Sequence, residues 1–126
     1  MAIKKKSESP LMHFVTAMFL SLSYLLIYPM YQAAISVGPN STLGYRTPRS
    51  RSSQNAWELA NNLAAQYSVR FSVGLTLLTL AVAAFLYFRG IRSQVAWRSL
   101  NFGVIGAWMI GTFVIIALVE TRLATL

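Results

Sequence analysis

The residues best suited to chemistry lie in one short segment, Gly44-Tyr45-Arg46-Thr47-Pro48-Arg49-Ser50-Arg51. Its arginines could bind phosphate or carboxylate, because the planar guanidinium group presents five donors in a fork. In an extended chain alternate side chains point to opposite faces, so we expect Arg49 and Arg51 on one face and Arg46 on the other. The alternative interpretation is that these arginines reach lipid head groups and satisfy free carbonyl groups at helix ends.

Elsewhere the chain offers few groups for catalysis or metal binding. It has no Cys and no Asp, its acids are Glu8, Glu58 and Glu120, and its only imidazole is that of His13. Disulfides and thiolate metal sites are excluded, and a lone histidine is typical of an interfacial residue rather than a metal or haem ligand. Glu58 is expected to pair with an arginine of the segment rather than act as a general base. We therefore predict a protein that is not an enzyme and holds no cofactor or metal.

Composition indicates the medium in which this chain folds. Hydrophobic residues make up 56% of its 126 residues, and the mean hydropathy is +0.52. A soluble domain of this size cannot hide so much apolar surface from water, whereas a membrane accommodates it. The net charge of +8 lies outside the apolar stretches, which favours anionic lipid head groups over nucleic acid as the partner.

Three stretches are long enough to cross a bilayer. About 20 helical residues at a rise of ~1.5 Å span the ~30 Å hydrocarbon core. We predict transmembrane helices over residues 10–37, 69–88 and 99–119, the first of them kinked at Pro29. The remaining segments are a basic N-terminal tail (1–9), a loop that contains the arginines (38–52, the motif loop), a short loop (89–98) and a C-terminal tail (120–126).

An additional helix is predicted between the first two spans, over residues 53–68. Ser52 or Ser53 could cap it. Small and apolar residues recur at spacings of three and four, namely Ala56, Ala60, Leu63, Ala64 and Tyr67. This pattern is typical of a short amphipathic helix that lies on the membrane interface, ending near Tyr67 or running directly into the second span. The predicted fold class is all-α: an integral membrane protein with three transmembrane helices and one interfacial helix.

The third span carries a helix-packing pattern. Gly103, Ala107 and Gly111 repeat every four residues and Gly106 lies close to them, so another backbone can approach closely. We expect packing within the bundle, with contact to another protein as the alternative. Trp108 falls near the middle of the span, where its indole N–H needs an acceptor, so it is expected to face another helix or a second protein.

A longer run of residues resembles a known family. Gly38-Pro39-Asn40, Leu43 to Ser50, Ala56-Trp57 and Ala60-Asn61, which follow one span and precede two more, resemble the SdpI-type family of small bacterial integral membrane proteins. The resemblance implies a multi-pass protein of the bacterial inner (cytoplasmic) membrane. The family is named for an immunity protein that protects cells producing a secreted peptide toxin and takes part in toxin sensing by drawing a repressor to the membrane.

Two functions remain open from the sequence. The first is an SdpI-type immunity or signalling protein that binds a partner or an anionic group at the motif loop. The second is an accessory structural subunit of a larger bacterial membrane complex. The expected partners are a bilayer with anionic lipids and either a membrane protein or a peptide toxin, but no nucleic acid. The candidate binding residues are Tyr45, Arg46, Thr47, Arg49, Arg51, Trp57 and Asn61.

Overall fold

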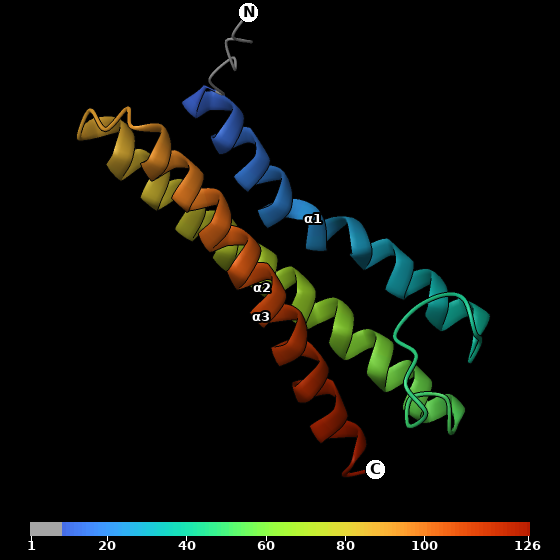
Figure 1. Ribbon diagram of the computed structural model, residues 1–126. Coiled ribbons are helices and arrows are strands. Elements are labelled where there is room, and N and C mark those ends of the chain that lie inside the picture. Colours follow the sequence, from blue (N-terminus) through green and yellow to red (C-terminus); the bar gives the residue numbers. More distant parts are fainter. Residues whose placement is uncertain (1–8) are drawn as a thin grey trace, which may run out of the picture.

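The computed structural model describes residues 9–126, which form three α-helices and no strand. Helix α1 spans Pro10–Val37, α2 spans Gln54–Phe88 and α3 spans Gln94–Leu123. Helix α2 runs antiparallel to the other two, so that α1 begins and α3 ends at opposite ends of the bundle (Figure 1). Each helix packs against both others. Residues 1–8 of the predicted N-terminal tail lie outside the described residues.

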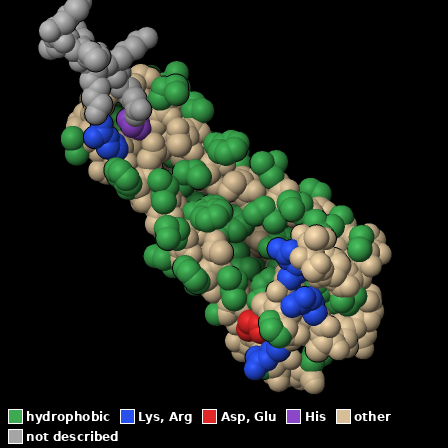
Figure 2. All heavy atoms as spheres, turned by 45° about the vertical axis from the view of Figure 1, so that its right-hand side comes forward, with side chains coloured by type: hydrophobic (Ala, Val, Ile, Leu, Met, Phe, Trp, Pro, Cys, Tyr) green, Lys and Arg blue, Asp and Glu red, His purple; other side chains and the backbone are tan. Residues whose placement is uncertain are grey.

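All three helices are long and apolar enough to cross a membrane. Their outer faces expose large apolar side chains, among them Phe19, Leu26, Phe88, Ile110 and Phe113. Figure 2 shows hydrophobic side chains along the length of the molecule and basic side chains towards its two ends. Water would disfavour so large an apolar surface, whereas hydrocarbon accommodates it. The chain is a multi-pass membrane protein, as its sequence predicts.

The helix ends follow local sequence signals. The Ser9 hydroxyl accepts a hydrogen bond from the backbone N–H of Met12, at 3.4 Å, just before Pro10 begins α1. This helix continues through Pro29 as one element, so a single first helix is confirmed. The Ser53 hydroxyl accepts the N–H of Ala56 at 3.1 Å and caps α2, which is one of the two caps predicted.

The predicted helix forms, but a separate interfacial helix over residues 53–68 does not. Helix α2 continues without interruption to Phe88, which is the other ending that the sequence left open. No proline occurs in α2 and its one glycine, Gly74, is tolerated inside a helix. The predicted apolar face is buried: Ala56, Ala60 and Ala64 pack in a core cluster with residues of α1, α3 and the motif loop. Because protein covers this face, the membrane interface is not needed to bury it. At ~1.5 Å per residue α2 is about 50 Å long, which exceeds the ~30 Å hydrocarbon core.

Polar side chains also join the helices inside the bundle. The hydroxyls of Ser21 in α1 and Thr79 in α2 lie 3.0 Å apart, and the Ser72 hydroxyl donates to the carbonyl oxygen of Ser21 at 2.6 Å. All three side chains are buried. Such small hydroxylated residues let two backbones approach closely while their polar atoms remain hydrogen-bonded.

The third helix packs through residues that the sequence singled out. Trp108 faces α1, as expected: its indole N–H donates to the Ser23 hydroxyl at 2.9 Å and its ring packs against Tyr24. Gly111 allows close contact with α2, because a Cβ there would lie 2.1 Å from Cζ of Phe71.

The other small residues of the predicted packing set fall in two different environments. Ala107 packs against a second core cluster, which is formed by buried residues of all three helices: Ala17, Leu75, Ala83, Trp97, Leu100 and Val104. Gly103 and Gly106 instead face open space, since a Cβ on either would meet no atom within 4 Å. The four-residue repeat therefore does not run along a single interface inside the described bundle.

Candidate functional site

The motif loop is fastened to the helices by two buried side chains of α2. Trp57 has no exposed surface, and its indole N–H donates to the carbonyl oxygen of Ala34 at 2.8 Å. This oxygen also accepts the N–H of Gly38, at 3.1 Å, where α1 ends. Asn61 is equally buried: its Oδ1 accepts the N–H of Tyr45 at 2.7 Å, and its Nδ2 donates to the Trp57 carbonyl oxygen at 3.0 Å. The start of α2 thus holds both the end of α1 and the middle of the loop.

Gly44 lies between α1 and α2 at a point where no side chain fits. Its φ is +89°, and a Cβ would lie 2.4 Å from both Cβ of Ala34 and Oδ1 of Asn61. A positive φ favours glycine, and the contact distance excludes even a methyl group without movement of its neighbours. Glycine is therefore required at this position for two independent reasons.

Tyr45 also links the motif loop to α3. Its hydroxyl donates to Oε1 of Glu120 at 2.9 Å and lies 3.4 Å from the carbonyl oxygen of Ile116. Burial, followed by this hydrogen bond to the carboxylate, raises the pKa of the Tyr45 hydroxyl well above its ordinary value. Tyr45 therefore remains a protonated donor across the physiological pH range.

The segment from Thr47 to Ser50 forms a tight turn. The buried Ser50 hydroxyl accepts the N–H of Thr47 at 2.9 Å, and the Thr47 hydroxyl accepts the N–H of Ser50 at 3.2 Å. Pro48 follows Thr47 at a turn position that suits its fixed φ. The extended chain expected here is wrong, because these reciprocal side-chain bonds offer the backbone a closed alternative. The predicted alternation of the arginines does not apply to a turn.

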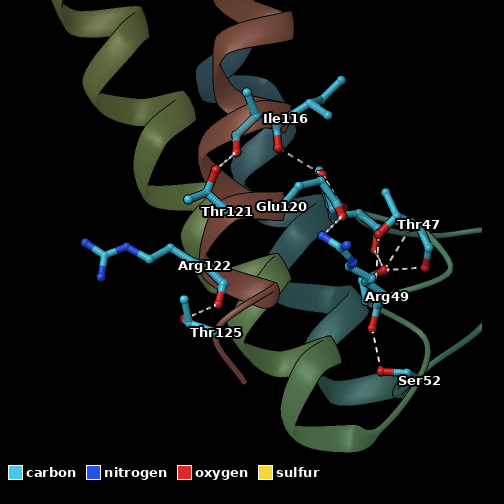
Figure 3. Close-up of polar contacts among 11 residues, drawn as sticks. Thr47, Arg49, Ser52, Ile116, Glu120, Thr121, Arg122 and Thr125 are labelled. Carbon is cyan, nitrogen blue, oxygen red and sulfur yellow. Dashed lines mark hydrogen bonds and ion pairs between the residues drawn. The ribbon is translucent and has the colours of Figure 1, made fainter.

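The three arginines of the loop are exposed to solvent. Arg49 reaches α3, where its Nη1 lies 3.9 Å from Oε2 of Glu120 (Figure 3). Arg46 donates from Nη1 to the carbonyl oxygen of Ser41 at 2.5 Å. Figure 2 shows this basic surface beside an acidic side chain at the loop end of the molecule.

The acid that pairs with the loop is not the one expected from the sequence. Glu58 accepts a hydrogen bond from Gln54, one turn earlier in α2, at 2.7 Å. Glu120 instead pairs with an arginine of the loop, Arg49, and also accepts the hydrogen bond from Tyr45. A signal was present in the topology: with three spans, the motif loop and the end of the third span must emerge on the same side of the membrane.

A cavity of about 300 Å³ lies beneath the motif loop. Hydroxyl-bearing side chains from all three helices contribute to its lining, namely Tyr24, Tyr31, Ser68 and Thr112. Ile115 and Ile116 add an apolar wall, and the loop residues Gly44 to Thr47 complete the lining. This motif pocket is at the small end of the roughly 300–1,000 Å³ typical of ligand sites.

Comparison with known proteins places this arrangement in a family. The sequence model of the SdpI/YfhL protein family matches residues 36–122, from the end of α1 through α3. The chain belongs to the SdpI/YfhL family. The match covers the motif loop, Glu120 and the α2 residues that hold the loop. No curated protein and no solved structure matches the chain.

Within this SdpI/YfhL chain, the seven candidate residues fall into two groups. The backbone or side chains of Tyr45, Thr47, Trp57 and Asn61 make the hydrogen bonds that hold the loop. The side chains of Arg46, Arg49 and Arg51 lie on the surface. Sequence reasoning did not single out Ser50, Glu120 or the hydroxyl groups of the motif pocket, because their roles depend on contacts between distant segments.

Proposed function

We propose that this protein is a non-enzymatic SdpI-type immunity or signalling protein of the bacterial inner membrane, which binds an anionic group of its partner at the motif loop. The observation that supports this proposal is the rigid display of Arg46, Arg49 and Arg51. Tyr45 ties the loop to Asn61 of α2 and to Glu120 of α3, and Trp57 holds the end of α1 from which the loop starts, yet the loop arginines remain exposed. Loops positioned by a rigid scaffold are common sites of recognition.

The local charge favours an anion. The motif loop (38–52) contains three arginines and no acid. One of them, Arg49, lies 3.9 Å from the Glu120 carboxylate of α3. Arg46 is the charged residue that lines the motif pocket, and its Nη1 donates to the Ser41 carbonyl oxygen. A carboxylate or phosphate at the pocket entrance would meet the remaining N–H donors of its fork.

The partner that fits this site is a peptide toxin or a membrane protein. A peptide presents a terminal carboxylate together with apolar side chains, and the pocket combines Arg46 with hydroxyl groups and the Ile115–Ile116 wall. The lipid bilayer would hold such a partner near the loop and restrict its search to the membrane surface.

Deletion and complementation in the native organism test this proposal. Cells that lack the protein should become sensitive to a peptide toxin made by the same or neighbouring cells, and the parent chain should restore protection. R46Q and R49Q should fail to restore it while reaching the membrane in parental amounts. R98Q removes an exposed arginine from the opposite end of the bundle and serves as the matched control. Full protection by R46Q and R49Q would refute a binding role for the loop.

A second candidate function is supported by a different observation. Gly103 and Gly106 of α3 face open space rather than another helix of the described bundle, so a neighbouring membrane helix could approach closely there. This surface suits an accessory subunit of a larger membrane complex. Purification from native membranes in mild detergent distinguishes the two functions: stoichiometric recovery of larger subunits that is lost in G103L supports the accessory role.

A further inference from the structure

An apolar groove lies at the end of the bundle opposite the motif loop. It has a volume of about 590 Å³ and is formed where α1 begins, α2 ends and α3 begins. Its apolar walls include Leu11 and Phe14 of α1, Leu80 and Ala84 of α2, and Trp97 of α3. The volume falls within the roughly 300–1,000 Å³ typical of small-molecule sites.

One wall of the groove is built by a well-defined helix end. The N–H of Gly90 donates to the carbonyl oxygen of Tyr87 at 3.0 Å, and that of Ile91 donates to Leu86 at 2.9 Å. With φ of +66° at Gly90, this is the Schellman arrangement that ends a helix. The Trp97 indole N–H then donates to the Ile91 carbonyl oxygen at 2.9 Å. Backbone and indole hydrogen bonds therefore fix this wall of the groove.

Among residues 9–126, the charged side chains near the groove are all basic. Arg92 contributes directly to its lining, and the exposed Arg89 and Arg98 lie in the same connection and at the adjacent start of α3. Among the described residues both acids, Glu58 and Glu120, lie at the other end of the bundle, near the motif loop. A ligand held here would meet apolar walls at one of its ends and cationic groups at the other.

We propose that this groove binds one anionic phospholipid of the surrounding bilayer. An acyl chain lies along the apolar walls, and the phosphate group contacts the Arg92 guanidinium. The chemistry matches each part of the ligand: hydrocarbon is the medium around these helices, and arginine binds phosphate through paired N–H donors. Aromatic residues such as Tyr87 and Trp97 suit the head-group level, where amphipathic rings are favoured.

Native mass spectrometry of the purified full-length chain tests the proposal directly. The protein in mild detergent is titrated with phosphatidylglycerol and, separately, with phosphatidylcholine of the same acyl chains. One phosphatidylglycerol should bind per chain with a clear preference over phosphatidylcholine. R92Q should reduce this preference about fivefold, as expected for one arginine at an anionic membrane surface. R122Q, which removes an exposed arginine at the opposite end of the bundle, should leave the preference at the parental value.

A second variant tests the hydrocarbon part of the site. Ala84 is exposed and lines the groove, so A84W should fill it and abolish tight binding of both lipids while the unfolding midpoint stays near that of the parent. Equal binding of the two lipids by the parent, or equal effects of R92Q and R122Q, would overturn the proposal. Binding of lipid only after removal of residues 2–8 would overturn it as well, because the N-terminal segment would then be the occupant.

Discussion

Replacing Gly44 by alanine is predicted to destabilise the protein more than the same change at Gly90 or Gly103. The φ of +89° strains an L-residue by roughly 1–2 kcal/mol. The new methyl group would also lie 2.4 Å from Cβ of Ala34 and Oδ1 of Asn61, and overpacking of this kind costs roughly 1–3 kcal/mol. The two effects together predict a loss of roughly 2–5 kcal/mol, a large part of the ~5–15 kcal/mol that stabilises a typical protein.

Reversible unfolding in mixed detergent micelles, followed by circular dichroism as the denaturing detergent increases, measures this loss. Two other glycines separate its components. Gly90 has a φ of +66° but open space around its Cα, so G90A should cost only the conformational part, about 1–2 kcal/mol. Gly103 lies inside α3 and also has open space, so G103A should stabilise the protein by roughly 0.5–1 kcal/mol.

The relative unfolding free energies of the three variants decide the test. If G44A lost no more stability than G90A, the close passage of the loop between α1 and α2 would not exist in solution, and the account of the motif loop as a rigid platform would fail. If G103A were destabilising, another protein segment would contact Gly103 under the conditions of the assay.

Further predictions concern the contacts that hold the loop. W57F removes the indole N–H donated to Ala34 and leaves a cavity at a fully buried position. The lost hydrogen bond and the cavity together should lower the free energy of unfolding by roughly 2–3 kcal/mol; no change in the same unfolding assay would refute both the bond and the burial of Trp57. The raised pKa of Tyr45 stabilises the fold fully below its ordinary pKa of ~10 and loses that contribution as pH rises above it, so stability should fall in alkali and Y45F should flatten the fall. R49Q removes an ion pair whose arginine side chain is 60% exposed, so it should change stability by no more than about 1 kcal/mol; a larger loss would make Arg49 a structural residue.

The sequence predicted the helices better than it predicted their continuity. The lengths and compositions of the uncharged stretches are sufficient to identify three spans, because the thickness of the hydrocarbon fixes the number of helical residues required. They do not reveal whether residues 54–68 form a separate helix. That depends on what covers Ala56, Ala60 and Ala64, which are buried by other segments of the chain.

The sequence predicted which residues form the candidate site, but not which of them hold the loop and which are exposed. The arginine-rich segment drew attention to Tyr45 and the arginines, and the family resemblance added Trp57 and Asn61. Only contacts between distant segments show that Asn61 binds the Tyr45 backbone and that Glu120, 75 residues away, binds the Tyr45 hydroxyl. Local sequence carries no information about such pairs.

The most direct test of the central claim measures protection and stability together in two triple variants. R46Q/R49Q/R51Q removes the three exposed charges of the motif loop, and R70Q/R98Q/R122Q removes three exposed charges elsewhere in α2 and α3. Protection against the toxin and the free energy of unfolding are measured for both. The loop variant should keep near-parental stability and lose protection, whereas the control keeps both. Loss of stability in the loop variant, or protection equal to that of the control, would contradict the claim that these arginines serve a partner rather than the fold.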